Sequence, residues 1–159
     1  MGFATNVDDI NLIYDAGLAQ LVTGFVNNED LEGDPIAVSA LDANRKVAMA
    51  KDDPITTNGD HVHSRLFKSA TYNSATGLDY ANQTTTRSTD KVLSGTISVD
   101  TLRYGQVIEV PSVVIVRGAG ASANGKYYVS QVQHSISEGK YQQLISVQRE
   151  GFGSTVTKV

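Results

Sequence analysis

The chain has 159 residues, of which 40% are hydrophobic and 19% charged, with a formal net charge of −4. These values are typical of one folded globular domain, spanning residues 1–159, and they exclude a disordered chain. The sequence has no cysteine, which excludes disulfides, a thiolate nucleophile and cysteine metal sites.

Charge is distributed unevenly along the sequence. Residues 1–60 hold 11 acidic and 3 basic side chains, whereas residues 61–159 hold 6 acidic and 10 basic ones. This asymmetry is compatible with two surfaces for different partners, with one subunit docking its acidic half on a neighbour's basic half, or with solvated loops alone. The basic residues are scattered rather than gathered with aromatic residues, so we expect no nucleic-acid specificity.

We expect neither secretion by a signal peptide nor membrane insertion. Asp8 and Asp9 lie where a secretory signal needs positive charge. The longest nearly apolar stretch, around residues 12–26, is interrupted by Asp15, Gln20 and Thr23 and is therefore too polar to span a membrane.

The N-terminal segment has the spacing of an amphipathic helix. Apolar residues recur at steps of three and four, at Ile10, Ile13, Tyr14, Leu18, Leu21, Val22 and Phe25. Asn6 or Asp8 would be a suitable N-cap for this helix. Gly17 and Gly24 weaken the prediction, because each costs a helix about 1 kcal/mol relative to alanine.

Residues 36–90 are expected to contain a hairpin and long polar loops. Two alternating runs around Asp42–Arg45 predict a β-hairpin over residues 36–50, and the Pro, Asn-Gly and Asp content of residues 52–60 predicts a loop. Beyond it, Val62, Leu66 and Ala70 would share one face of a helix capped by Asp60. Residues 72–90 are so rich in Thr, Ser, Asn and Gly that a long exposed loop is equally consistent, and such loops usually function or become ordered on assembly.

From Lys91 onward the sequence has strand composition. Residues 92–99, 112–118, 126–136 and 140–150 predict strands, and a fifth is expected after a turn at Tyr104–Gly105. Their connections are too short for parallel crossovers, so the strands must be antiparallel. We therefore predict a mainly β fold, with an antiparallel, tube-like β-barrel core over residues 91–153 and one or two accessory helices.

Residues 113–129, VVIVRGAGASANGKYYV, contain two glycine patterns of nucleotide-binding loops. Gly120 to Lys126 matches most of a phosphate-binding loop, and Gly118 to Ala123 matches a dinucleotide-binding turn. The first pattern needs Ser or Thr at position 127, which is Tyr, and both need a following helix to bind phosphate at its N-terminus. Residues 127–132 have strand composition instead, so we predict a flexible hairpin connector and no cofactor.

No metal site and no catalytic group are predicted. Asp60-His61-Val62-His63 could chelate a metal from a strand, but the only other histidine is His134. There is no Gly-x-Ser-x-Gly elbow, and His134 lies among glutamines that suit cross-strand hydrogen bonding. Asp52-Asp53 lies in a polar loop rather than in the apolar pocket that paired catalytic carboxylates use. The chain is therefore not expected to be an enzyme.

The C-terminal strands carry a pattern found in one protein family. They read Gly125-Lys126-Tyr127-Tyr128-Val129-x-x-Val132-x-His134-x-Ile136, then Gly139-x-Tyr141, then Arg149-x-Gly151. With the turn from Leu102 to Val107, they resemble the C-terminal barrel of the phage late control D, VgrG and contractile-tail baseplate hub family, over about residues 92–152. We expect one strand to place Tyr128, Val132, His134 and Ile136 on a single face, and the next to do so with Tyr141, Gln143, Ile145, Val147 and Arg149.

The resemblance implies a structural role rather than a chemical one. Hub proteins of this family form a trimer at the end of a tail tube and match its six-fold symmetry to a three-fold spike. For this chain it implies a virion component of a phage tail or contractile injection system, assembled in the host cytoplasm. Such a subunit would self-assemble into a homotrimer or ring and contact tail-tube, spike and baseplate proteins.

Two departures from the family leave alternatives open. Family hubs are usually more than twice this length and carry two barrels, and residues 1–90 match no pattern of the family. The alternatives are a fragment or reduced hub, another tail-tube or tail-completion protein, and a non-catalytic β-domain that binds carbohydrate or protein. Seven Tyr, four Phe and no Trp give little material for a carbohydrate-binding platform.

Overall fold

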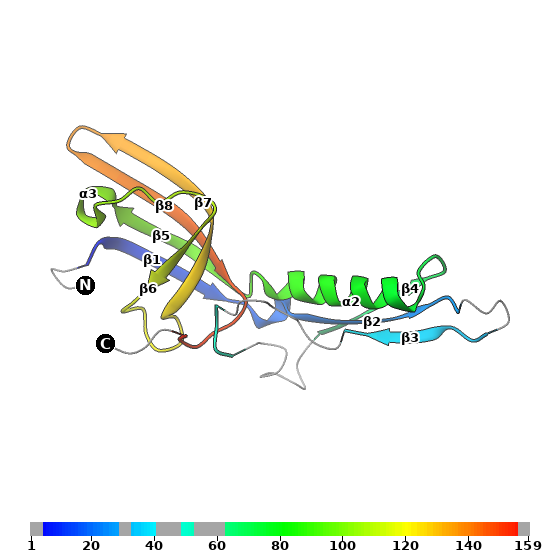
Figure 1. Cartoon of the computed structure of the whole chain (residues 1–159). Coiled ribbons are helices and arrows are strands. Elements are labelled where there is room, and N and C mark those ends of the chain that lie inside the picture. The colour runs from blue at the N-terminus through cyan, green and yellow to red at the C-terminus, as the bar shows by residue number, and fades with distance from the viewer. Residues whose placement is uncertain (1–4, 29–32, 41–48, 53–62, 156–159) are drawn as a thin grey trace.

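Two β-sheets lie end to end and give the molecule an elongated shape (Figure 1). The computed structural model describes residues 5–28, 33–40, 49–52 and 63–155. A five-stranded sheet forms one end of the molecule. A three-stranded sheet covered by one long helix forms an arm that projects from the other end, and the arm's elements lie between the first and second strands of the larger sheet in the sequence.

The five-stranded sheet is antiparallel, in the order β1-β5-β8-β7-β6. Its strands are β1 (Val7–Tyr14), β5 (Leu93–Asp100), β6 (Ser112–Val116), β7 (Gly125–Ser137) and β8 (Lys140–Arg149). The last four confirm the predicted strands and their antiparallel pairing. β1 was not predicted, so the sheet draws on the N-terminal segment as well as on residues 91–153.

One face of this sheet forms the main hydrophobic core. The buried members are Leu93, Ile97, Val99, Ile108, Tyr127, Val129, Ile145 and Val147, and Val7, Ile10 and Leu12 of β1 pack against them. The opposite face is mixed: neighbouring strands place Thr96, Ser146 and Gln131 side by side on it, and it also carries the exposed Val113, Ile115 and Leu144. Because this alternation has period two, these strands could be recognised in the sequence.

The structure does not confirm a closed barrel. The sheet is strongly curved, with β6 and β7 bending back across β1 and β5 (Figure 1). Its hydrogen-bonded order nevertheless begins at β1 and ends at β6, and no pairing joins these two strands in the described part of the chain. The sheet therefore has two free edges.

The strand predicted after Tyr104–Gly105 is wrong. Thr101–Tyr104 form the short helix α3, and its N-cap Asp100 accepts hydrogen bonds from the N–H groups of Leu102 and Arg103 at 3.0 and 3.2 Å. Gly105 ends the helix with a φ of 77°, which confirms the turn. The following segment is irregular because its buried residue, Ile108, hydrogen-bonds to the side chain of Gln143 instead of to a strand.

The arm consists of β2 (Gln20–Val26), β3 (Ile36–Ser39), β4 (His63–Ser69) and α2 (Ser74–Thr89). β2 is central, antiparallel to β3 and parallel to β4. α2 lies along one face of this sheet (Figure 1). The core between them is small: Val22, Ala40 and Ala81 are buried, and Leu21 and Phe67 pack against them.

The helix predicted over residues 10–25 is wrong. This stretch forms β1, the 3-10 turn η1 (Ala16–Leu18) and β2. Its many β-branched residues favour strands, and Asp15 begins the turn by accepting a hydrogen bond from the N–H of Gly17 at 2.9 Å. The spacing of three and four arose because two strands of different sheets follow each other.

The long polar loop predicted over residues 72–90 is instead α2. The helix begins with a capping box, in which the side chains of Asn73 and Thr76 each accept a hydrogen bond from the other's N–H, at 2.9 and 3.0 Å. Its buried positions are Gly77, Ala81, Thr85 and Thr89, which are small or carry hydroxyl groups. A helix whose buried face is this polar gives no hydropathy signal.

Hydroxyl groups attach α2 to the arm's sheet. The N–H groups of Gln20 and Val22 donate to the side-chain oxygens of Ser88 and Thr85, each at 3.0 Å. These residues of β2 lie beyond the end of its pairing with β3, so the helix satisfies main-chain donors that the sheet leaves free.

The helix expected from Val62, Leu66 and Ala70 is also wrong, because residues 63–69 form β4. In the hairpin predicted over residues 36–50, the first run is β3, which pairs with β2. Its turn at Asp42–Arg45 lies outside the described residues, as does most of the loop predicted over residues 52–60. None of the helices that the structure describes is long and apolar enough to cross a membrane.

A β-bulge changes the side-chain faces of β7. The pairing register with β8 shifts between Val129 and Gln131, so Tyr127 and Val129 face the core before the bulge and Val132 faces it afterwards. Tyr128 therefore lies on the opposite face from Val132, and the expectation that they share a face is wrong. The expected common face of β8 is confirmed for Tyr141, Gln143, Ile145, Val147 and Arg149, all buried or half-buried.

Candidate functional site

The glycine-rich stretch is the loop of the β6–β7 hairpin. Val116 pairs with Gly125, and the residues between them form the connection. The N–H of Ala119 donates to the side-chain oxygen of Asn124 at 2.9 Å, and the N–H of Asn124 donates to the carbonyl of Gly120 at 2.8 Å. The chain then enters β7 rather than a helix. The predicted hairpin connector is confirmed, and these hydrogen bonds give it a defined turn.

Arg149 holds this loop from the end of β8. Its side chain is 1% exposed, and its Cζ lies 4.6 Å from the centre of the Tyr127 ring. The guanidinium donates to three main-chain carbonyls, those of Ser122 (2.8 Å), Asn124 (3.0 Å) and Gly151 (3.0 Å). Burial lowers the pKa of Arg149 from its ordinary value, while Tyr127 and Glu150 act in the opposite direction. The three carbonyls replace the water that the cation loses.

Two neighbouring residues complete this junction. Gly125 has a φ of 139°, and a Cβ atom there would lie 2.6 Å from Nη1 of Arg149, so glycine is required. Glu150 is buried and accepts hydrogen bonds from the N–H groups of Met49 and Ala50, the latter at 3.2 Å. These contacts tie the segment 49–52 to the arm-side end of the five-stranded sheet.

The opposite end of this sheet is held by Gln143. Its buried side-chain amide exchanges two hydrogen bonds with the main chain of Ile108, at 3.0 and 2.9 Å. Nearby, Nδ1 of His134 lies 2.9 Å from the hydroxyl of Tyr141 on the adjacent strand. The predicted cross-strand hydrogen bonding of His134 is confirmed. The residues that carry the family pattern thus have structural roles.

The structure describes only one histidine of the His-x-His pattern. His61 lies outside the described residues, and His63 is exposed at the start of β4. No group of three His, Asp or Glu side chains that could hold a metal ion occurs within residues 5–28, 33–40, 49–52 and 63–155. Asp52 instead forms an isolated bridge with Phe152.

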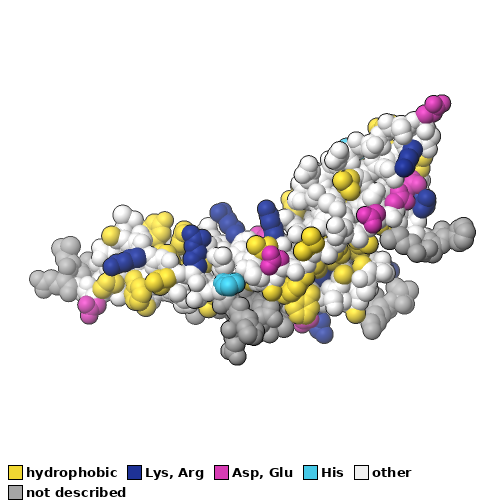
Figure 2. Space-filling view, turned by 180° about the vertical axis from the view of Figure 1, so that it is seen from behind, with side chains coloured by type: hydrophobic (Ala, Val, Ile, Leu, Met, Phe, Trp, Pro, Cys, Tyr) yellow, Lys and Arg dark blue, Asp and Glu magenta, His cyan; other side chains and the backbone are white. Residues whose placement is uncertain are grey.

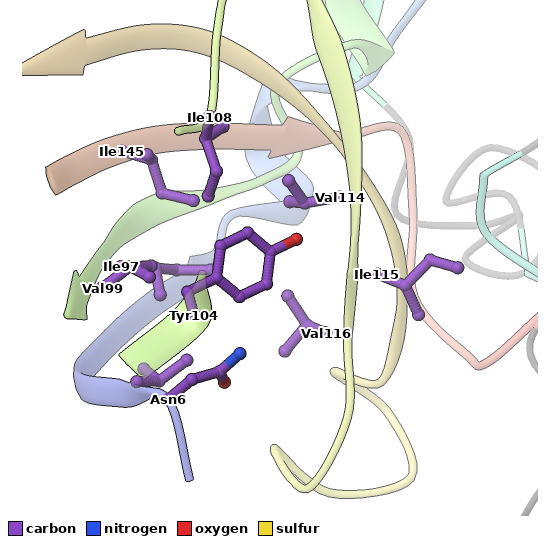
Figure 3. Close-up of a pocket in the computed structure, with 10 residues that line it drawn as sticks. Asn6, Ile97, Val99, Tyr104, Ile108, Val114, Ile115, Val116 and Ile145 are labelled. Carbon is purple, nitrogen blue, oxygen red and sulfur yellow. The ribbon is translucent and has the colours of Figure 1, made fainter. Parts of the chain in front are cut away.

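Apolar cavities lie at both ends of the main core. One of about 70 Å³ opens beneath β6, where Val114 and Val116 point toward Ile97 and Ile145, while Ile115 points away (Figure 3). Another of about 350 Å³ lies at the arm-side end, where the rings of Tyr14 and Phe152 meet edge to face at 5.4 Å. The linings are mainly aliphatic and aromatic, which suits packing against another apolar group.

The edge strands differ in how they are protected against pairing with another chain. β1 has a register shift between Val7 and Asp9, β3 has only four residues, and β4 carries Arg65 and Lys68. These features discourage edge-to-edge pairing. β6 reads Ser-Val-Val-Ile-Val, and its outward Val113 and Ile115 are each 52% exposed. β6 is therefore the edge best suited to pairing.

Exposed apolar side chains occur along the whole molecule, with Ile13, Leu18, Val113 and Ile115 in its middle part, and they include a group at each end. One group lies where the β7–β8 hairpin extends past β5, with α3 and the segment after it; we call residues 8–9, 100–111 and 134–141 the distal end. Leu102 and Ile136 there are 67% and 75% exposed, and Tyr104, Val107 and Val110 are also exposed. On the arm, Leu66 of β4 is 69% exposed and Phe25 is exposed as well. Such groups often mark contact surfaces.

These surface residues were missed in the sequence. Leu66 was placed on a helix face, and Ile136 was expected inside a paired hairpin. Their exposure depends on where strands pair and where a hairpin outgrows its neighbour, which hydropathy does not reveal. In the sequence, contact between subunits was implied by the family resemblance and was one of three interpretations of the uneven charge.

No protein-family model matches the sequence, and no curated protein matches it. Among solved structures, the chain is similar to the 43 kDa tail protein of prophage MuSo2 from Shewanella oneidensis, with a TM-score of 0.61 and 12% identity. The likeness covers 94% of this chain and 42% of the tail protein, so the chain spans less than half of that protein's length. At this identity the likeness shows a shared fold. Its extent means that most of residues 1–90, which matched no pattern of the hub family, share that fold too.

Proposed function

We propose that this chain is a structural subunit of a phage tail or contractile injection system, a hub-like protein that assembles into a homotrimeric ring between tail tube and spike. The observation that carries the proposal is the likeness of 94% of the chain to a prophage tail protein. As such a subunit it is a virion component, and it contacts tail-tube and spike proteins of the baseplate.

The free edges of the larger sheet support assembly by strand pairing. β1 and β6 each have one hydrogen-bonded neighbour, and β6 lacks charge. In the proposed ring, these edges meet the sheets of neighbouring copies, which closes the curved sheets into a tube-like barrel. On the face opposite the core, Thr96, Ser146 and Gln131 suit contact with water in the lumen of such a tube.

The proposed role is non-catalytic. The described histidines are exposed, and Arg149 and Glu150 use their polar atoms to hold main-chain segments. The cavities are mainly apolar. These features favour packing over chemistry.

Self-assembly can be measured on the purified full-length chain. We expect light scattering after size-exclusion chromatography to detect a species with three times the mass of the 17.0 kDa chain, and negative-stain microscopy to show rings. A strict monomer at the highest soluble concentration would contradict the proposal.

The role of β6 can be tested separately. Ile115 lies on this edge strand, and its side chain points away from the core. Ile115→Lys should therefore leave the fold intact but weaken self-association roughly tenfold or more. Leu144→Lys is the control, since Leu144 is also exposed but lies on the central strand β8. Equal effects of the two variants on association would argue against pairing through β6.

A further inference from the structure

We propose that copies of this chain contact each other head to tail, with the β4 edge of one arm seated on the distal end of the next copy. This inference rests on the proposed self-assembly and adds to it a contact separate from the strand pairing of β1 and β6. The occupant of the distal end is thus a second copy of this chain.

Both surfaces present apolar side chains that their own chain leaves uncovered. Leu66 projects from the arm's edge strand, and Ile136 and Leu102 project at the distal end; each is more than 60% exposed. Burying such side chains between copies would remove apolar area from water, worth about 25 cal/mol per Å². Within the described residues, β4 also has a strand partner on one side only.

The two surfaces have complementary charge. β4 carries Arg65 and Lys68 without any acidic residue, whereas the rest of the described arm carries both signs, with Asp34, Asp79 and Arg87 exposed. Figure 2 shows Lys and Arg side chains spaced along the arm, with an acidic side chain near its tip, and at the other end of the molecule Asp and Glu side chains with basic ones among them. The distal end has five carboxylates against two cations: Asp8, Asp9, Asp100, Glu109 and Glu138, with Arg103 and Lys140.

One of the two distal cations is already engaged. Arg103 lies 3.4 Å from Asp100 and 3.8 Å from Asp8, so it neutralises carboxylates of its own chain. Asp9 and Glu138 are exposed there. An incoming Arg65 and Lys68 would therefore meet an excess of negative charge, which steers association and fixes its orientation.

The elongated shape makes this contact heterologous. The arm and the distal end lie at opposite ends of the molecule (Figure 1), so one copy offers its arm in one direction and its distal end in the other. Repetition of such a contact closes into a ring when the rotation between copies allows it. Two arms placed edge to edge would instead oppose Arg65 and Lys68 to themselves.

Charge reversal tests the proposed contact. Arg65→Glu with Lys68→Glu should weaken association roughly tenfold or more at low salt, and so should Asp9→Lys with Glu138→Lys. A chain carrying all four changes should recover most of the loss. Lys51→Glu with Lys126→Glu is the control, because it makes the same change in net charge at exposed positions outside both surfaces. Sedimentation velocity over a range of concentrations measures association, and circular dichroism confirms folding.

Cross-linking gives a second test that does not depend on charge. Because the sequence has no cysteine, Leu66→Cys and Ile136→Cys each introduce a unique thiol. When the two variants are mixed and treated with a short bismaleimide, the predicted product joins position 66 of one chain to position 136 of another. Products that join 66 only to 66, or 136 only to 136, would overturn the head-to-tail contact.

The outcomes separate this inference from the proposed function. If the unmodified chain forms no oligomer, both fail. If it forms oligomers whose association is unchanged by the charge reversals, or which give no 66–136 product, the head-to-tail contact is wrong and the structural role stands.

Discussion

Arg149 links three segments of main chain through a single side chain. Its guanidinium reaches the β6–β7 loop at Ser122 and Asn124 and the chain beyond β8 at Gly151. The planar fork of an arginine can serve several carbonyls at once, whereas a lysine ammonium is a compact point charge. The residue therefore acts as a structural clamp at the arm-side end of the sheet.

Replacing this arginine should show how much its planar guanidinium contributes to the free energy of unfolding. Arg149→Lys keeps the charge but loses the fork, and we expect it to lower the free energy of unfolding by roughly 2–4 kcal/mol. Arg117→Lys, the same change in an exposed arginine, should alter it by less than about 0.5 kcal/mol. Urea denaturation measures both values. A loss for Arg149→Lys as small as that for Arg117→Lys would refute the clamp.

The buried hydroxyl of Tyr127 predicts that the stability of the fold decreases at alkaline pH. Its hydroxyl donates to the carbonyl of Ala123 at 2.6 Å, and burial raises its pKa above 10.0, partly opposed by Arg149. A raised pKa means that the folded state favours the neutral phenol. The stability it contributes is therefore present below pH 10 and is lost as the pH rises through the folded pKa.

The variant Tyr127→Phe isolates this effect. At pH 7 we expect it to be about 0.5–1.5 kcal/mol less stable than the unmodified chain, because one hydrogen bond is lost. Above pH 10 the difference should narrow, since only the unmodified chain must keep this phenol neutral. Chemical denaturation from pH 7 to pH 11 gives the difference directly, and a constant difference would contradict the assignment.

At the scale of elements, α2 packs closely against its sheet because the residues on its buried face are small. Gly77 faces the arm's core, where an added Cβ would lie 2.4 Å from Cγ1 of Val26. Gly77→Ala should therefore destabilise the arm by about 1–3 kcal/mol, although alanine favours helices by about 1 kcal/mol over glycine. Gln83→Ala, on the exposed face of the same helix, is the control and should be neutral or slightly stabilising. Denaturation followed by circular dichroism at 222 nm measures both, and a gain in stability for Gly77→Ala would refute the close packing.

Elements whose buried face alternates in hydropathy could be predicted from the sequence. β5, β6, β7 and β8 lie where they were expected, and the turn at Gly139 and the hairpin loop before Gly125 follow from residue type. β1 and β2 were merged into one helix because their apolar residues, taken together, imitate its period. α2 was read as a loop because the residues that it buries, such as Ala81 and Thr85, are small or polar.

The candidate contact surfaces could be predicted from the sequence less well than the fold. Contact between subunits was one of three interpretations of the uneven charge, and the structure locates Arg65 and Lys68 on the edge strand of the arm and five carboxylates at the distal end. Ile136 and Leu66 are exposed only because the β7–β8 hairpin outgrows β5 and because β4 is an edge. Those facts depend on pairing between segments far apart in the chain, which local patterns do not encode.

At the scale of the whole molecule, the two parts differ in the size of their cores. Among the described residues, the buried cluster of the larger sheet has eight members, against three in the cluster of the arm, where Val26 and Val38 are buried in addition. We expect amide hydrogen exchange to be faster in β2, β4 and α2 than in β5, β7 and β8, because local opening costs less where fewer apolar contacts are lost. Protection of β4 should rise on self-association. Uniform exchange rates across both parts would contradict this view.

The hydroxyl attachment of α2 to β2 also bears on how far related sequences can diverge. Thr85 and Ser88 act through one oxygen each, and Ala81 acts through its small volume. Serine in place of Thr85 would keep the accepting hydroxyl, and glycine in place of Ala81 would keep the small volume. The attachment of α2 to β2 would remain in both cases. The arm thus constrains the volume and hydrogen-bonding capacity of these residues more than their identity.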